Sequence, residues 1–491
     1  MTVGRERIIF GFRKVNNCPI VLAWGPQPPP AIRVASLWFV RRANDSWQSR
    51  LEERRAGGYI GNIPILMRVL IACDSFKGTL SAIEACDALA RGISSAWPGV
   101  RTSLCPLSDG GEGTVALLAR SLGMGVESVK VTGPMGVKID AEIAWCDGSV
   151  FRCIGAQPGA LVAAIEVASC SGLTLVPLVR RNPLQTTSYG FGEAILHAVK
   201  NGANWIVLGL GGSATVDGGL GCLQALGAKL RGVAGMAQGS SLQAIAGIDL
   251  SEVRQNMAGV RLVVANDVQN PLLGARGAAR AFGPQKGATP EMVEVLESGM
   301  EHYARLLVEG ATPDARLLAQ RATQSSNFVA AVDQPSAGAA GGLGFAPGVA
   351  LRAESRFVAA VDQTSAGAAG GLGFALGVAL RAESFRGIEL LLNVTGFDER
   401  LKLADLVITG EGRLDVSSFE GKVVSGVVER SRRRGVPVWV VAGSSDLPRE
   451  HWARHGLSRV YCLTDIAQDE TVAQAHAAAI LAELPKQFDW S

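Results

Sequence analysis

The stretch that most strongly constrains the fold is residues 209–221, with the sequence GLGGSATVDGGLG. It follows an apolar run at 205–210 that predicts a buried strand, and it leads into residues 220–228, which predict the start of a helix. Backbone amides at such a strand-to-helix turn are free to bind an anion, and the helix dipole favours one there. The turn therefore indicates either an anion-binding loop or simply a tight, capped turn.

Four residues of this turn are candidates for cradling phosphate or carboxylate oxygens: Gly211, Gly212, Ser213 and Thr215. Asp217 is a candidate for holding a cation or accepting a proton. The stretch fits neither the G-x-G-x-x-G dinucleotide pattern nor the Gly-Lys-Ser/Thr Walker pattern, so it does not identify a familiar nucleotide loop by itself.

A second polar turn follows the predicted strand at 69–73 and contains Asp74, Ser75 and Lys77. A helix is expected from Ser81 to about residue 95, because Ser81 and Glu84 have the spacing of a capping box. In open α/β sheets ligands bind at the carboxyl ends of the strands, where these side chains would lie. This turn is therefore a second candidate for the site.

Similar turns recur along the chain. Asp109 lies in the glycine-rich turn 108–114 before a predicted helix at 115–122, and residues 163–171 are expected to be helical. A strand at 404–408 leads into Thr409–Asp415, a helix begins at Gly421–Lys422, and another strand covers 436–442. This alternation of strands and helices predicts an α/β fold with a largely parallel sheet.

Composition narrows the functional classes. The 491 residues carry a formal net charge of +3, which gives no reason to expect nucleic-acid or membrane-surface binding. Nine scattered cysteines include no C-x-x-C pair and suit a reducing cytoplasm, where we expect the protein. We find neither an apolar run that would span a bilayer nor a signal peptide. The sequence leaves the oligomeric state open.

Residues 1–66 differ from the rest: they are proline- and tryptophan-containing and show little periodicity. We expect a disordered or mistakenly translated extension, with Met67 as the real start. The remainder is predicted to comprise a Rossmann-like domain in two parts, 67–125 and 289–491, with a second α/β domain inserted at 126–288.

A tandem duplication interrupts the last part. Residues 328–355 recur almost unchanged at 357–384, and only Pro335/Thr364 and Pro347/Leu376 differ. Two copies are too few for a stacked repeat array, which needs about three. We expect one copy, the second, to occupy the native position.

Eight motifs, in order, resemble those of the type I glycerate kinases from about Met67 to the C-terminus. They are residues 74–78 (DSFKG), 108–114 (SDGGEGT), 181–184 with 187–193 (RNPL, TSYGFGE), 211–219 (GGSATVDGG), 270–274 (NPLLG), 282–288 (FGPQKGA), 367–373 (GAAGGLG) and 409–415 (TGEGRLD). The chain departs from the family pattern at Val216, where the family often has Asn, and at 416–418, where it usually has Gln-Ser.

The resemblance implies two α/β domains, a Rossmann-like parallel sheet with a second domain inserted, and an active site in the cleft between them. It implies transfer of the γ-phosphoryl group of ATP to D-glycerate, with Mg²⁺, usually giving 2-phosphoglycerate. Phosphoryl transfer depends mainly on positioning and charge neutralisation. We accordingly assign Lys77 to a phosphate or substrate anion, and Asp217 or Asp109 to the base.

The remaining assignments follow the same logic. Glu411 and Asp415 would hold Mg²⁺, and Arg413 or Arg181 would clamp the glycerate carboxylate through two parallel bonds. Further substrate- or phosphate-binding candidates are Asp74, Ser75, Thr187, Ser188, Gly211, Gly212, Ser213, Thr215 and Lys286.

Two other functions stay open at this point. The strand–glycine–helix turns also occur in dinucleotide-dependent oxidoreductases, although the fingerprint is missing here. The duplication favours a vestigial kinase that binds its ligands without turnover.

Overall fold

The computed structural model describes residues 11–15, 18–22, 59–60, 63–64, 67–311, 358, 360–362, 365–467 and 469–489. By their contacts, Met1–Leu66 and Met67–Ser491 form separate units. The first unit contains two antiparallel strand pairs, β1 (Gly11–Val15) with β2 (Cys18–Leu22), and β3 (Tyr59–Ile60) with β4 (Ile63–Pro64). The second unit carries everything described below.

A five-stranded sheet in the order β17-β16-β15-β5-β6 is parallel throughout. The chain runs outward from β5 to β6, and it later returns to β15 on the other side of β5 before continuing outward to β16 and β17. The order therefore reverses between β5 and β15, which creates the topological switch point where such sheets bind ligands. The strands are β5 (Met67–Cys73), β6 (Val100–Leu104), β15 (Leu406–Leu414), β16 (Val438–Ser445) and β17 (Arg459–Cys462).

A six-stranded sheet in the order β14-β13-β10-β9-β8-β7 is mixed. Strands β14, β13, β10 and β9 are parallel, whereas β8 and β7 join as antiparallel neighbours. Its strands are β7 (Gly125–Thr132), β8 (Lys138–Asp147), β9 (Leu161–Glu166), β10 (Trp205–Gly209), β13 (Arg261–Ala265) and β14 (Glu383–Phe385), and a small separate pair consists of β11 (Lys229–Arg231) and β12 (Gly247–Asp249).

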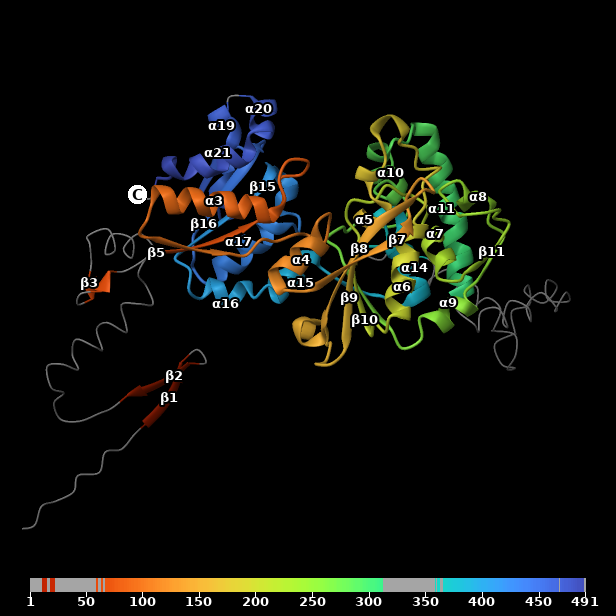
Figure 1. Cartoon of the computed structure of the whole chain (residues 1–491), viewed down its shortest axis with the longest axis horizontal. Coiled ribbons are helices and arrows are strands. Elements are labelled where there is room, and N and C mark those ends of the chain that lie inside the picture. Colours follow the sequence, from red (N-terminus) through yellow and green to blue (C-terminus); the bar gives the residue numbers. More distant parts are fainter. Residues whose placement is uncertain are drawn as a thin grey trace, which may run out of the picture. The chain divides into compact units, whose positions relative to one another are not determined.

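Each sheet has its own helices (Figure 1). Those of the five-stranded sheet are α3 (Ala82–Ala96), α16 (Phe397–Leu401), α17 (Val423–Arg433), α18 (Arg449–Trp452), α19 (Leu463–Ala467), α20 (Glu470–Ala475) and α21 (Ala477–Glu483). Those of the six-stranded sheet are α5 (Val167–Ser171), α6 (Tyr189–Lys200), α7 (Leu220–Ala225), α8 (Ser241–Ala244), α9 (Ser251–Asn256), α10 (Ala278–Phe282), α11 (Pro290–Ala311) and α14 (Ala368–Leu380).

Short 3-10 helices connect several of these elements. They are η1 (Gly148–Ile154), η2 (Leu173–Leu175), η3 (Leu178–Arg180), η4 (Pro284–Lys286), η6 (Val416–Phe419), η7 (Ala453–His455) and η8 (Leu484–Gln487). None of the described helices is both long and apolar enough to cross a membrane.

Helices α4 (Thr114–Leu122) and α15 (Gly387–Val394) join the two sheets through one shared core. Val115 of α4 and Ile388 of α15 belong to the same buried cluster as Leu70 of the five-stranded sheet and Val263 of the six-stranded sheet. The turns at the ends of these strands are consequently held close together. The sheets confirm the predicted α/β class.

Local sequence signals explain several element boundaries. Helix α3 begins with the expected capping box: the Ser81 hydroxyl accepts the Glu84 amide, and the Glu84 carboxylate accepts the Ser81 amide. Helix α4 instead follows Gly113 and has no side-chain cap of its own. Glu166, at the end of β9, supplies it by accepting the amides of Gly113 and Val115 at 3.3 and 3.0 Å. This remote cap secures α4 against the six-stranded sheet.

The expected helix over residues 163–171 is wrong for its first half. Residues 161–166 form β9, whose strand neighbours β10 and β8 cover both edges, and only Val167–Ser171 is helical. The run Leu-Val-Ala-Ala-Ile is buried in the sheet, and for so short an apolar run tertiary pairing outweighs local propensity.

The strand pairing also bears on the expected domain boundary at residue 288. Helix α11 packs against α8, and β14 at 383–385 still pairs with β13 in the six-stranded sheet. The chain therefore changes sheets after β14. The excursion from the five-stranded sheet is longer than the predicted insertion 126–288.

The second copy of the duplicated segment lies in the core. Its helix α14 buries Leu372, Phe374 and Leu376, and its last residues contribute to β14. The second copy therefore contributes to the core and to the six-stranded sheet, and its assignment as the native copy stays a prediction. The first copy, residues 328–355, lies outside the described residues.

Candidate functional site

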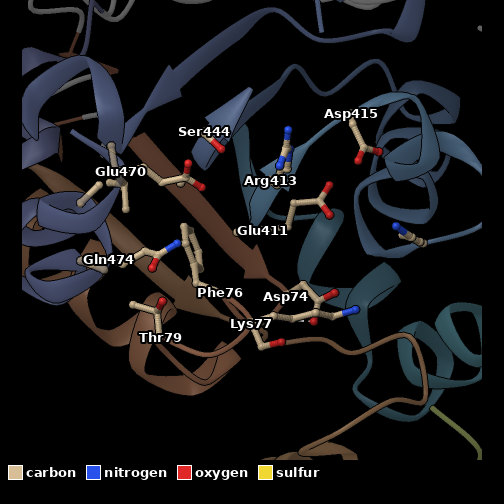
Figure 2. A pocket seen from close by; sticks show the side chains of 17 residues that line it. Asp74, Phe76, Lys77, Thr79, Glu411, Arg413, Asp415, Ser444, Glu470 and Gln474 are labelled. Atoms are coloured by element: carbon tan, nitrogen blue, oxygen red, sulfur yellow. Dashed lines mark hydrogen bonds between the residues drawn. The ribbon is translucent and has the colours of Figure 1, made fainter. Parts of the chain in front are cut away.

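A cavity of about 260 Å³ opens at the switch point of the five-stranded sheet. The turn after β5 supplies Asp74 and Lys77, and the end of β15 supplies Glu411 and Asp415. Figure 2 shows these side chains together, with Glu470 and Gln474 of α20 entering from another side. The complete lining is Asp74, Ser75, Phe76, Lys77, Thr79, Glu411, Gly412, Arg413, Asp415, Lys422, Gly443, Ser444, Leu463, Glu470, Ala473, Gln474 and Ala477.

The carboxylates of this cavity differ in environment. Burial, followed by the nearby Asp109 carboxylate, raises the pKa of Asp74 to about 7. Burial likewise raises the pKa of Glu411, whose Oε1 is enclosed without a hydrogen-bond donor among the described residues. The Ser417 hydroxyl and amide, at 2.6 and 2.7 Å, lower the pKa of Asp415. Glu411 is therefore the carboxylate with the greatest need of an external partner.

Lys422 connects this cavity with a larger neighbour. It precedes α17, lines both cavities, and donates to the Ser417 hydroxyl at 2.6 Å. Arg413 is less available, because its guanidinium donates twice to Asp446, at 2.8 and 2.6 Å. The lysine thus lies where a group could pass between two bound ligands.

The larger cavity has a volume of about 680 Å³ and combines turns from both sheets. Backbone contacts are close here: an added Cβ on Gly211 would meet the Gly111 Cα at 2.4 Å, and one on Gly110 would meet the Ala265 carbonyl at 2.6 Å. Only glycine allows this approach. The lining residues are Asp109, Gly111, Gly211, Asn266, Asp267, Val268, Gln269, Asn270, Arg276, Phe282, Ser417, Glu420 and Lys422.

Residues 210–219, which follow β10, form what we call the closed turn, because its polar groups face inward. Asp217 is fully buried and lines neither cavity. Its carboxylate accepts the Ser188 amide and hydroxyl at 2.8 and 2.7 Å, and the amides of Gly219 and Gly221 at 3.1 and 3.3 Å. With these four hydrogen bonds Asp217 holds the turn together, and its assignment as the base stays a prediction.

Lys286 secures the same turn from η4. The side chain is buried and donates to the Ser213 hydroxyl at 2.9 Å and to the Thr215 carbonyl at 2.7 Å. Burial lowers the pKa of Lys286 to about 7. The position of Lys286, Ser213 and Thr215 therefore favours a structural role over direct contact with a ligand.

Of the other predicted binding residues in this part of the chain, one lines a cavity and the rest contact the protein's own groups. Gly211 lines the larger cavity, whereas Gly212 has a φ of +77° and faces Ala168. Thr187 donates to the Ala237 carbonyl at 2.6 Å, and Ser188 is engaged with Asp217. Arg181 lines neither cavity and reaches the Gln285 carbonyl at 3.4 Å.

The cavities also contain residues that the motif analysis did not assign. They are Asp267, Arg276 and Lys422, together with Glu470 and Gln474. Position alone could have indicated two of them, because Asp267 follows a buried strand and Lys422 follows a glycine at a helix start. The residues of α20 approach only through the tertiary fold.

Fold and cavities together define an α/β protein with two adjoining polar sites, one at the switch point of a parallel sheet, that share a lysine. The Glycerate kinase family model matches residues 69–361 and 349–488. Its two matches overlap at the duplicated segment, and the first begins two residues after Met67.

Individual proteins similar to this chain point to the same family. The chain is 38% identical to the glycerate kinase of Bacillus subtilis (strain 168) over 416 residues, covering 84% of this chain and 94% of the relative. It is 36% identical to the glycerate 2-kinase of Escherichia coli (strain K12) over 400 residues, covering 80% and 90%. A crystal structure described as a glycerate kinase 2 from Salmonella typhimurium LT2 superimposes with a TM-score of 0.61 at 35% identity, covering 86% and 96%. The chain belongs to the glycerate kinase family.

Proposed function

We propose that this protein transfers the γ-phosphoryl group of ATP to the 2-hydroxyl of D-glycerate, giving 2-phosphoglycerate and ADP. Family membership and the activities named for the relatives support this reaction. The observation that carries it is that Lys422 lines two adjoining polar cavities. A kinase needs two substrates side by side with a cation at the transferred group, because phosphoryl transfer is achieved mainly by positioning and charge stabilisation.

We place the nucleotide in the smaller cavity. This cavity lies at the switch point of the parallel sheet, where α/β proteins bind their ligands. Phe76, Leu463 and Ala473 offer apolar surface for a base, and the Gln474 amide offers hydrogen bonds to it. Lys77 and Lys422 would then contact the phosphates.

Glu411 and Asp415 fit a Mg²⁺ ion brought in with the nucleotide. Both line the smaller cavity, and Glu411 has an enclosed oxygen without a hydrogen-bond donor among the described residues. No group of three or more metal-binding side chains occurs in the described part of the chain. This suits Mg²⁺, which proteins usually hold through one or two carboxylates together with substrate phosphates. The ion would neutralise phosphate charge.

We place glycerate in the larger cavity. Arg276 is the arginine that lines it, so we assign the carboxylate to Arg276 in place of Arg413 or Arg181. The turn containing Gly111 and Gly211 would support the ligand from the other side. Of the two bases considered from sequence, only Asp109 lines this cavity.

The test is glycerate-dependent ADP formation by the full chain and by a version lacking residues 328–356, with ³¹P NMR of the product. We expect 2-phosphoglycerate, and we expect Lys422→Met to lower kcat by about 10²–10³-fold, the cost of losing one electrostatic contact to the transition state. Lys200→Met, at the exposed end of α6, is the matched control.

Three results would count against the proposal. ADP formation that needs no glycerate would contradict glycerate as the substrate. A 3-phosphorylated product would contradict the 2-hydroxyl as the acceptor. Inactivity of both versions, with a melting temperature still raised by Mg-ATP, would identify a vestigial kinase, because binding to the folded state alone raises the midpoint.

A further inference from the structure

The carboxylate of Asp267 is the unusual group of the larger cavity. It is the second residue after β13 and lies in what we call the open turn, residues 266–274. Its side chain is 8% exposed. Oδ2 accepts the Ile388 amide at 3.0 Å, which fixes the carboxylate against the start of α15.

The second oxygen, Oδ1, is enclosed but has no hydrogen-bond donor among the described residues. The Arg386 guanidinium pairs with it through charge, but its Nε lies 3.8 Å away, too far for a hydrogen bond. An enclosed carboxylate oxygen without a donor is costly unless a ligand supplies one. A substrate hydroxyl in this cavity would be such a donor.

Asp109 lies beside Asp267. A Cβ added to Gly387 would meet the Asp109 carbonyl at 2.1 Å and Asp267 Oδ2 at 3.0 Å, so both residues border the same point. Asp109, Arg386 and Glu389 act on Asp267 through their charges, and Arg276, Glu420 and Lys422 line the same cavity. Burial, with a further contribution from Asp109, raises the pKa of Asp267 to about 7, while the Ile388 amide and Arg386 oppose the rise.

The other two candidate bases are less suited to take a proton. Asp217 has four donors and no access to either cavity. Asp109, like Asp267, has one oxygen engaged, since Oδ1 accepts the Gly111 amide at 3.0 Å, but among the described residues only Asp267 of the two has an enclosed oxygen without a donor. Resting on the proposed function, we propose that Asp267 is the general base that takes the proton of the glycerate 2-hydroxyl.

Asp267 Oδ1 accepts the hydroxyl proton while the glycerate oxygen forms its bond to the γ-phosphorus of ATP. The bond from that phosphorus to the β,γ-bridging oxygen breaks, and ADP leaves with the electron pair. The proton on Asp267 is then released to solvent.

The experiment measures kcat and the glycerate KM against pH for the full chain and for Asp267→Asn. We expect kcat to fall by about 10²–10⁴-fold, the usual contribution of a general base, with a KM change below about threefold. In the wild type, activity should decline below about pH 7 because the base becomes protonated, and this decline should disappear from the residual activity of the variant. Asp140→Asn, an exposed residue paired with Lys130, is the matched control.

Thermal melting with and without Mg-ATP and glycerate shows whether Asp267→Asn still folds and binds. If it does not fold, Asp267→Glu keeps a base at a shifted position, and we expect reduced activity with a displaced acid limb. A variant with wild-type kcat and an unchanged pH profile would overturn this inference alone. A wild type that forms no ADP with glycerate would overturn the proposed function as well.

Discussion

The closed turn and the open turn follow neighbouring parallel strands, β10 and β13, and end at the same edge of one sheet. In the closed turn, Asp217 accepts hydrogen bonds from the protein's own amides and a hydroxyl, and Lys286 of η4 donates to Ser213 and Thr215 of the turn. In the open turn, Asp267 keeps one oxygen without a donor among the described residues, next to a cavity. The glycine-rich turn 210–219 thus directs its polar groups into the protein, whereas the turn 266–274, which has a single glycine, contributes to a cavity.

This difference shows that a glycine-rich motif can reflect tight packing of the backbone and need not bind a ligand. Added Cβ atoms on Gly218 and Gly219 would meet Tyr303 and Ala375 side chains at 2.6 and 2.7 Å, and both glycines have positive φ. Their absence of side chains permits tight packing, and no ligand is needed to explain them. A high glycine content therefore indicates a closely packed backbone. Whether a turn binds a ligand depends on whether its polar groups line a cavity.

The largest expected effect on stability is that of Asp217→Ala. It leaves buried amides and a hydroxyl without an acceptor, and at about 1–3 kcal/mol for each unsatisfied group the loss should exceed about 3 kcal/mol. Urea unfolding measures the loss, and kcat of the remaining folded protein should change by less than about tenfold. A variant that is stable but inactive would instead support Asp217 as the base, and it would contradict the structural role that we assign to the closed turn.

The second effect tests whether the repeat closes the turn. Gly370 has a φ of +68°, and an added Cβ would lie 2.0 Å from the Thr215 carbonyl. Gly370→Ala should cost about 1–3 kcal/mol through overpacking and backbone strain. Gly341→Ala, the equivalent change in the first copy, should leave the melting temperature unchanged. Equal losses in both variants would contradict the assignment of the second copy to the core.

The third effect depends on pH. The pKa of Lys286 is lowered from 10.5 to about 7 in the folded state, so between these values the unfolded chain binds more protons. Stability contributed by this site should therefore rise with pH across that window and stay flat below it. Lys286→Met should lack the rise and, at pH 9, be less stable by about 1–3 kcal/mol, because Ser213 and Thr215 lose their donor.

Melting curves of the wild type and Lys286→Met from pH 6 to 10 measure this difference. A difference that is constant with pH would show that Lys286 stays charged in the folded protein.

The smallest effect on stability belongs to the open turn. Arg276 is exposed, so Arg276→Ala should change the free energy of unfolding by less than about 0.5 kcal/mol. The glycerate KM should nevertheless rise by about tenfold or more, because a charge-assisted bond to the substrate carboxylate is worth about 1.5–3 kcal/mol. An unchanged KM would show that Arg276 does not bind the glycerate carboxylate. Arg152→Ala, on the exposed surface of η1, is the control.

Much of the fold followed from local signals. The capping box at Ser81 and Glu84 located α3, and buried apolar runs located β5 and β10. Strand β9 was missed, because its apolar run reads equally well as a helix and its identity comes from pairing with β8 and β10. Glu166, which caps α4 across 51 residues, illustrates a contact that only the tertiary fold reveals.

The site was predictable in part. The rule that ligands gather at strand ends indicated Asp74 and Lys77, and the family resemblance indicated Glu411 and Asp415; all four share a cavity. Motifs could not tell which way a side chain points, so Asp217 and Ser188 were chosen although they face the interior. Their functions, like those of the cavity residues, stay predictions until measured.

The pairing of β15 with β5 has a consequence for the conformational entropy of the chain. The Arg68 amide and the Asp405 carboxylate that meet there are 337 positions apart, so pairing these two strands closes a very large ring. The entropic penalty of ring closure grows only with the logarithm of ring size. The 29-residue offset of the duplication changes that logarithm by less than a tenth, a penalty below about 0.1 kcal/mol. Since β5 and β15 are already paired across such a span, a second copy of one segment between them adds almost no closure entropy.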